Sequence, residues 1–421
     1  MSEDLLDGLV GAQLLEPAGA GRYRMHDLLR LFAREKLDQD EPPADRTAAW
    51  TRLLEVAIGL AGEMDTAFRG DHARVTQAAA LGWLEAERAN LVALASRSAT
   101  DGPKEATGQL ADTLGRFLDL RGYRQDLCAV CEAALIAAQC AEDTTAQIQA
   151  YFHLASAYDG ASRLADAEHA LGGCLSLVRD TDDRFQEALC LGQLAHIHEH
   201  QERYEDAERA LGECLSLLRE AGDDHHEAIF LGQLGDLYRA QRRFADAEHA
   251  VAASLAISRR HDHGNHVAEN LQALAAIYAD QDRLDDAERV LTEEIRLHRR
   301  LENRHQEADG LSRLAHIHDR HDRRSDAESA LRNALAIFQE LGDQRCEADT
   351  LVCLGHVCRD RGNLQHEEDA LVESLTLFQA MNDKELEAKV LRLLADVYRR
   401  LGRADAADRC YRQARDLDVE Y

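Results

Sequence analysis

The histidines of this sequence are the residues whose spacing comes nearest to that of a metal site. His196 and His200 lie four residues apart, so on a helix their side chains share one face and form a possible chelating pair. His316 belongs to a second cluster, in which His318 takes the place of His198. Only pairs are available, and His198 falls on an apolar helix face. We therefore predict core packing for His198 and no metal site, with zinc at His196, His200 and His316 as the alternative.

The ten cysteines include the pair Cys128-x-x-Cys131, a spacing found in metal-binding and redox motifs. Cys131, however, falls on a large apolar position of a predicted helix, and Cys174 and Cys214 take a small-residue position. Thiols of intracellular proteins stay reduced, so we interpret these cysteines as helix-packing residues.

Motifs for catalysis are absent from the sequence. There is no Gly-x-x-x-x-Gly-Lys-Ser/Thr loop to hold nucleotide phosphates, no Gly-x-Ser-x-Gly and no His-Glu-x-x-His. We therefore predict that this chain is not an enzyme, does not hydrolyse ATP and has no cofactor of its own.

The helices that position these residues can be predicted from an internal repeat of the sequence. Leucines recur at one constant interval, at Leu191, Leu231, Leu271, Leu311, Leu351 and Leu391. Within one copy, 188–227, two sets of apolar and small residues lie three or four apart, which predicts two helices per copy. A period of about 40 residues is typical of stacked-repeat proteins.

Turn residues and small residues occupy fixed places in each copy. Gly222-Asp223, Gly342-Asp343 and Asn382-Asp383 each predict a left-handed helix end followed by an aspartate cap for the next helix. Small residues stand where the two helices of a copy must approach closely, for example Ala195 and Ala207. Two departures, Leu127 and Glu367, suggest looser packing in the first and seventh copies.

This arrangement resembles the tetratricopeptide repeat. The large, small and aromatic positions of the family are filled in one copy by Leu191, Leu194, Ala195, His198, Ala207, Leu211 and Cys214. The resemblance implies an all-α fold, a TPR-type α/α solenoid of about eight 40-residue repeats over residues 108–421, preceded by a winged-helix remnant and linker helices.

The composition of the chain argues against nucleic acid and membranes as binding partners. The formal charge of −29 opposes wrapping of a phosphate backbone, so we expect no direct nucleic-acid binding by this segment. No apolar run is long enough to span a membrane, and Met1-Ser-Glu-Asp4 does not resemble the basic start of a signal peptide. We expect a cytoplasmic protein.

Residues 1–40 have a different pattern, with helical periodicity from Leu5 to Leu15, a turn at 17–21 between two short strands, and a helix from Asp27 to about Leu37. Met25-His26-Asp27 in this context resembles the Met-His-Asp motif at the end of the NB-ARC core in STAND-class NTPases. The resemblance implies a winged-helix subdomain in which His26 senses nucleotide and Asp27 holds its geometry.

The segment Ala80-Leu-Gly-Trp83 to Leu91 is similar to the linker helices of actinobacterial regulators of the AfsR type. That resemblance implies three parts: 1–40 as the end of a winged-helix NB-ARC subdomain, 41–107 as a helical linker and 108–421 as the repeat solenoid. ADP or ATP would bind only in an intact parent protein, whose upstream NB-ARC region would be the ATPase. The abrupt start suggests a product or piece of such a regulator.

In the tetratricopeptide family the first helices line a concave groove, and the equivalent positions here are the predicted partner-binding residues. They are Arg116, Phe152, His196, Glu199, His200, Asp236, Arg239, His316, Asp319, Arg320, His356, Arg359, Arg392, Asp396, Arg399 and Arg400. The last four arginines of this groove set would make its C-terminal end locally basic and suited to an acidic peptide or anionic ligand.

We therefore predict a non-enzymatic sensor module of an AfsR-like STAND transcriptional regulator. It would bind a protein, peptide or ligand in the groove, control autoinhibition and oligomerisation, and be capable of self-association. Two alternatives remain: a free-standing repeat scaffold for protein complexes, and the sensor of a STAND protein used in antiviral or stress defence.

Overall fold

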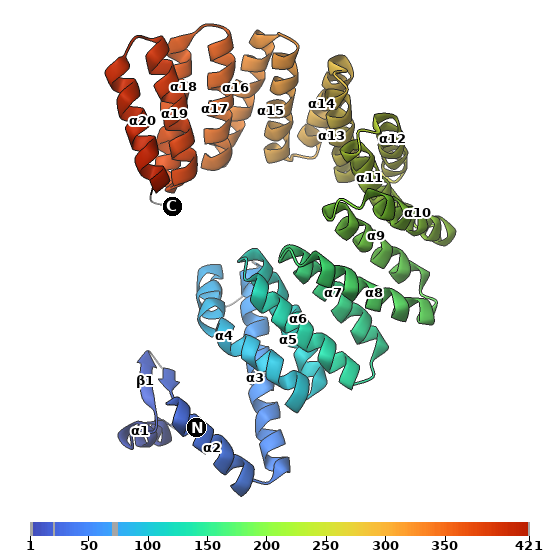
Figure 1. Ribbon diagram of the computed structural model, residues 1–421, viewed down its shortest axis with the longest axis vertical. Helices are drawn as coiled ribbons and strands as arrows, with labels where there is room; N and C mark the ends of the chain where they lie inside the picture. The colour runs from blue at the N-terminus through green and yellow to red at the C-terminus, as the bar shows by residue number, and fades with distance from the viewer. Residues whose placement is uncertain (1–2, 20–21, 70–74, 420–421) are drawn as a thin grey trace. The chain divides into compact units, whose positions relative to one another are not determined.

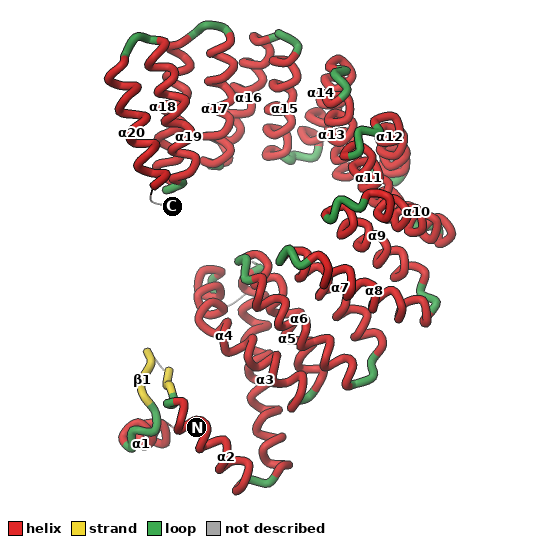
Figure 2. The backbone as a smooth tube through the Cα atoms, in the orientation of Figure 1, coloured by secondary structure: helices red, strands yellow, loops and turns green. Residues whose placement is uncertain are grey.

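The computed structural model describes residues 3–19, 22–69 and 75–419, which form two compact units, 1–201 and 202–421. Across these residues, no helix is both long enough and apolar enough to cross a membrane. The hairpin strands β1 and β2 are the only strands in the same ranges, as the yellow segments of Figure 2 show.

The first unit begins with a helix, a β-hairpin and a helix. The elements are α1 (Glu3–Gly11), β1 (Glu16–Gly19), β2 (Arg22–Arg24) and α2 (Asp27–Asp40). The helix predicted for residues 5–15 ends earlier, at Gly11, because Gln13 adopts a positive φ of 59° and reverses the chain. The turn predicted at 17–21 is also displaced, since Pro17 already pairs with Tyr23 in the ladder. Residues 20 and 21 of that turn lie outside the described residues.

Two long helices follow the hairpin, α3 (Pro43–Phe68) and α4 (Gln77–Asp101). They bury Leu54, Leu84 and Leu91 in a core that continues into the first repeat helices. Arg22 of the hairpin donates to the carbonyl oxygen of Ala86 at 3.0 Å and thereby fastens the hairpin to α4. The remaining helices of this unit are α5 (Lys104–Leu120), α6 (Arg124–Cys140), α7 (Thr144–Gly160), α8 (Leu164–Thr181) and α9 (Arg184–His200).

The second unit is an array of helices, each packed against the next in sequence. Its helices are α10 (Tyr204–Ala221), α11 (Asp224–Ala240), α12 (Phe244–Arg260), α13 (Gly264–Asp280), α14 (Leu284–Arg300), α15 (Arg304–Arg320), α16 (Arg324–Leu341), α17 (Gln344–Asp360), α18 (Leu364–Met381), α19 (Lys384–Arg400) and α20 (Ala404–Val419). Figure 1 shows α15 to α20 side by side as orange to red ribbons. The solenoid predicted from the internal period is confirmed.

The predicted helix ends and close approaches are confirmed. Gly222 and Gly342 both end helices with φ of 68°, and Asp223 accepts the backbone N–H of His226 at 3.0 Å. At Gly235 an added Cβ would stand 2.3 Å from a methyl group of Val251. The residue at this position must therefore be small for α11 to pack against α12.

A polar ladder that recurs in successive copies fixes first helices to their neighbours. Tyr238 donates its hydroxyl to Glu208 at 2.9 Å. Arg243 lies over the Tyr238 ring, 4.2 Å from its centroid, and donates to the same carboxylate at 2.6 Å. Tyr278, Glu248 and Arg283 repeat the arrangement one copy later.

The interpretation of Glu367 as a site of loose packing is wrong. Its side chain is only 3% exposed and accepts from Arg400 at 2.9 Å. A charge at a small-residue position is tolerated because a guanidinium from the next repeat neutralises it.

Candidate functional site

His26 stands at the start of α2, where it acts as the N-cap residue. Its Nδ1 accepts the backbone N–H of Leu28 at 3.4 Å, and its backbone is extended, with φ of −59° and ψ of 141°. The hydrogen bond favours the tautomer in which neutral His26 carries its proton on Nε2, which is then a hydrogen-bond donor. Asp27 occupies the first turn of α2, where its carboxylate pairs with Arg30 at 2.9 Å.

The apolar face of α2 is exposed. Leu28, Leu31 and Phe32 are exposed by 72%, 63% and 57%. Large apolar side chains that cluster on one exposed helix face are a frequent mark of an interface.

Among the predicted groove residues of the first unit, Arg116 of α5 is exposed and Glu199 of α9 is half-buried. Phe152 of α7 is also half-buried and packs against Val178 and Cys190, so part of its surface already belongs to a core.

The structure brings His196 and His200 together, as their spacing predicts. Their ring centroids are 4.1 Å apart. Asp159 of α7 lies against both, with oxygens 3.5 Å from His196 Nε2 and 3.0 Å from His200 Nδ1. Helical spacing predicts the histidine pair but not the carboxylate, which comes from the preceding copy. His198 is buried and contacts Glu168 at 3.3 Å, so its predicted core role is confirmed.

In the second unit, groove residues of α11 and α15 are paired with acids. Arg239 contacts Asp280 at 3.1 Å and Asp236 at 3.9 Å. Arg320 contacts Asp282 at 3.0 Å. On α15, His316 is exposed and Asp319 is half-buried.

At the C-terminal end, all four groove arginines have acidic partners. The contacts are Arg359 to Asp360 at 3.7 Å, Arg392 to Asp418, Arg399 to Asp396 at 3.9 Å, and Arg400 to Glu367 at 2.9 Å. The four arginines that were expected to make this end locally basic thus already lie against acidic side chains of the chain itself. Burial lowers the pKa of the neighbouring His356, which favours its neutral form. The surface offers paired charges of both signs, which a ligand would have to exchange.

The predicted packing role of the cysteines agrees with their burial. Cys128, Cys131, Cys174 and Cys214 are all buried. The thiol of Cys346 is half-buried beside a histidine and an aspartate, an arrangement reminiscent of a catalytic cysteine. Burial and the Asp343 carboxylate raise its pKa to about 11, however, which leaves the thiol protonated and a poor nucleophile at neutral pH.

Two concavities were not foreseen from the sequence. One, of about 250 Å³, lies between α5, α6 and α7 and includes Cys131 and His153 in its wall. The other, of about 560 Å³, lies between α3 and α4 and is apolar, with Trp50 and Trp83 in its wall and Val56 60% exposed at its edge. Val56 and Leu60, four residues apart on the outer face of α3, were the signal that could have revealed it.

Comparison with known proteins identifies the kind of repeat that the chain contains. The tetratricopeptide-repeat profile matches residues 184–260 and 346–418, so the chain carries tetratricopeptide repeats. The whole chain also aligns with a solved structure from Pyrococcus horikoshii, a signal transduction ATPase with numerous domains that has a tetratricopeptide repeat sensor. The TM-score is 0.57 with 16% identity, covering 99% of this chain and 58% of that one, and supports the fold.

Two named relatives are regulatory proteins called AfsR. The one from Streptomyces griseus is 34% identical over 202 residues, which cover 44% of this chain and 20% of the relative. The one from Streptomyces coelicolor is 39% identical over 116 residues, covering 23% of this chain and 12% of the relative. The aligned part of this chain thus spans a fifth or less of either relative.

Proposed function

We propose that this chain is the sensor-side part of an AfsR-like STAND transcriptional regulator. In this proposal the repeats bind a protein or peptide, and residues 1–40 complete a nucleotide-binding core. The observation that carries the proposal is His26 at the N-terminus of α2, directly after a hairpin, in a chain similar to AfsR proteins.

The geometry of His26 suits a phosphate ligand. Its Nδ1 is held by the Leu28 N–H, so Nε2 is the proton-bearing nitrogen and can donate to a phosphate oxygen. The N-terminus of the 14-residue helix α2 adds a favourable dipole for an anion. By its resemblance to the Met-His-Asp motif, His26 would contact ADP in the resting state, with Asp27 supporting the helix start.

This chain alone supplies too little for a nucleotide site. The sequence contains no phosphate-binding loop and no lysine for the phosphates near His26. The remaining contacts would come from an NB-ARC region outside residues 1–421. The exposed Leu28, Leu31 and Phe32 of α2 provide an apolar face against which such a region would pack.

The repeats would then act as a restraint on this core. A partner in the groove would exchange the existing ion pairs, such as Arg239 with Asp280, for contacts of its own. A ligand shifts a conformational equilibrium only by its differential affinity for the two states. Partner binding would therefore have to favour the open, oligomerising state over the autoinhibited one.

The test is reporter transcription driven by the full-length protein in cells. His26→Ala and deletion of 108–421 should both raise expression without inducer. His26→Asn is the matched variant, because asparagine retains the helix cap and lacks the imidazole. It should activate as strongly as His26→Ala while keeping the stability of the parent.

Three results would replace the proposal. If both variants stay fully dependent on the inducer, His26 is not the sensor and the repeats are not the restraint. If the full-length protein has no nucleotide-binding or DNA-binding region, the chain is a repeat scaffold. A nuclease or protease region in place of the DNA-binding part would indicate a defence sensor.

A further inference from the structure

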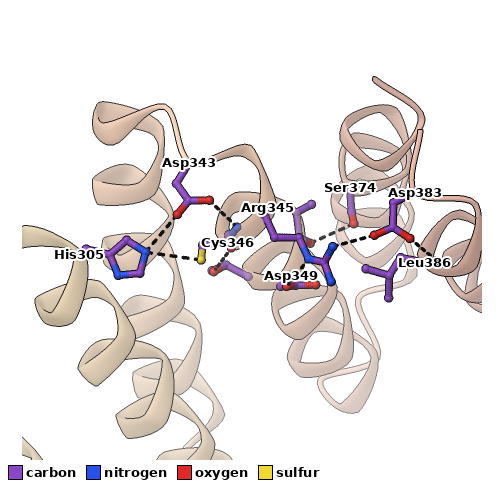
Figure 3. A network of polar contacts seen from close by, with 10 residues as sticks. His305, Asp343, Arg345, Cys346, Asp349, Ser374, Asp383 and Leu386 are labelled. Atoms are coloured by element: carbon purple, nitrogen blue, oxygen red, sulfur yellow. Dashed lines mark hydrogen bonds and ion pairs between the residues drawn. The ribbon is translucent and has the colours of Figure 1, made fainter. Parts of the chain in front are cut away.

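A nitrogen, an oxygen and a sulfur ligand converge between helices α15 and α17. His305 of α15 places Nε2 3.0 Å from Asp343 Oδ2 and 3.7 Å from Cys346 Sγ. The three ligand atoms all lie within 4.8 Å of one another. Figure 3 shows the imidazole, the carboxylate and the thiol pointing toward one another from the two helices.

The carboxylate and the imidazole are each held in place by further contacts. Asp343 caps α17 by accepting the Cys346 N–H on Oδ1 at 3.0 Å, which leaves Oδ2 facing His305. The His305 ring packs edge-on against Phe338, with centroids 5.4 Å apart. Its other nitrogen, Nδ1, lies 3.3 Å from Asp309. A histidine that binds a metal usually donates its second ring N–H to a carboxylate in this way.

The register of the repeats makes this cluster unusual. One copy further along, the equivalent positions hold Arg345, Asp383 and Leu386, and Arg345 forms an ordinary ion pair with Asp383 at 2.6 Å. One copy earlier they hold Asn265, Asn303 and Gln306, where the two asparagines share a hydrogen bond of 3.3 Å. Two copies earlier they hold three histidines, His225, His263 and His266.

The same structural position is thus a plain polar contact in two copies and a set of metal-ligand residue types in two others. In the His225 copy the ring centroids are 5.1 to 5.8 Å apart. Among these four copies, only that of His305 combines a nitrogen and an oxygen donor with a thiol. An imidazole, a thiolate and a carboxylate are the ligands that Zn²⁺ takes in proteins.

We propose that His305 Nε2, Asp343 Oδ2 and Cys346 Sγ bind one Zn²⁺ ion, with a water molecule as the fourth ligand. The ion replaces the protons that otherwise lie between these groups, and Cys346 binds as the thiolate. Because His305 belongs to α15, while Cys346 lies in α17 and Asp343 is the N-cap residue of α17, the ion joins two successive repeats. Asp309 is the positioning residue that orients the imidazole.

Cobalt substitution tests the site without any functional assay. The metal-free full chain is titrated with Co²⁺, whose tetrahedral thiolate complexes give a sulfur-to-metal charge-transfer band. We expect this band to saturate at about one equivalent and to be displaced by Zn²⁺. Asp309→Asn should weaken Co²⁺ binding about tenfold.

The variants are taken from the neighbouring copy, which shows that the fold accepts them. Cys346→Gln and His305→Asn introduce the residues found at Gln306 and Asn265. Cys346→Gln should abolish the band, His305→Asn should weaken binding at least tenfold, and helical circular dichroism should not change. Cys353→Ser, on the same helix with an exposed thiol, is the matched control and should keep the band.

Three results would overturn the proposal. They are no charge-transfer band at stoichiometric Co²⁺, a band that survives Cys346→Gln, or a band that is lost with Cys353→Ser. Co²⁺ bound without a thiolate band would assign the metal to a histidine cluster such as that of His225 and would also contradict the proposal.

Discussion

Replacing Arg400 separates a structural role from a ligand-binding role at a predicted groove position. Both oxygens of Glu367 accept from Arg400 Nη1, at 3.2 and 2.9 Å. The carboxylate is 3% exposed, whereas the guanidinium is 37% exposed. Arg400→Ala would therefore leave a buried charge without its partner, and the side chain cannot be removed without affecting stability.

The loss of stability expected for Arg400→Ala follows from the burial of the two groups. Breaking a fully buried pair costs about 3–5 kcal/mol, and partial exposure of Arg400 lowers the expected loss to about 2 kcal/mol. The double variant Glu367→Ala, Arg400→Ala should recover most of this loss, because it restores the small residue typical of the position. Arg399→Ala is the matched control. Arg399 is 60% exposed, lies 3.9 Å from Asp396 and covers the Tyr411 ring at 4.3 Å, so its loss should cost no more than about 1 kcal/mol.

The effect of Arg400→Ala should depend on pH. Burial raises the pKa of Glu367, while Arg400 opposes that rise. Without Arg400 the folded-state pKa rises further above the unfolded value. The folded state then binds its proton more tightly, so the destabilisation is small in acid and grows as the pH rises through the folded pKa.

Hydrogen exchange of α18 and α19 at about pH 5 and about pH 7.5 measures this locally, since a repeat contacts only its neighbours. Equal protection in Arg400→Ala and Arg399→Ala at both pH values would refute the role assigned to the buried pair. Arg400 would then be available to a groove ligand.

Four further predictions concern the packing and chemistry of the chain. Tyr238→Phe removes the hydroxyl donated to Glu208 and should cost about 0.5–1.5 kcal/mol in urea unfolding. The hydrogen bond from Arg243 lowers the pKa of Glu208. The ionised Glu208 therefore stabilises the folded state above its unfolded pKa, and this stabilisation is lost as the pH falls through the folded pKa. Glu208→Gln should accordingly weaken the dependence of stability on pH in the acid range. An unchanged dependence would contradict the stabilising role assigned to the polar ladder. Gly235→Ala places a methyl group against Val251 and should cost about 1–3 kcal/mol, seen as a lower Tm. The purified chain should release no phosphate from ATP, and activity that survives repurification would reveal a nucleotide site that no motif of the sequence signals.

The repeat architecture could be predicted from the sequence because the same packing problem recurs in every copy. The leucines, the small residues such as Ala207 and the caps such as Asp223 each satisfy a local requirement of a helix pair. The backbone conformation of the turns between the two helices of a copy was harder to predict from the sequence. Arg242, Asp282 and Asp322 adopt positive φ angles of 57° to 59° although none is glycine. Glycine signals this conformation at the equivalent Gly122, Gly362 and Gly402, whereas at Arg242 the packed helices impose it without such a signal.

The candidate site was predictable only in part. Helical spacing places His196 beside His200, but the carboxylate of Asp159 comes from another copy. Glutamates such as Glu208 and Glu248 occupy equivalent positions in successive copies and could have been paired with the tyrosines by register. The acidic partners of the exposed arginines could not have been predicted, since a long side chain can reach carboxylates on several neighbouring helices.

The most direct measurement of the central claim is the release rate of fluorescent ADP from the full-length protein and its His26→Ala variant. Loss of about 1.4 kcal/mol of binding to the resting state should accelerate release about tenfold. Deletion of 108–421 should accelerate it as well, because the repeats would no longer hold the core closed. Identical release rates for the parent, the His26→Ala variant and the deletion would contradict both the sensor role of His26 and the restraining role of the repeats.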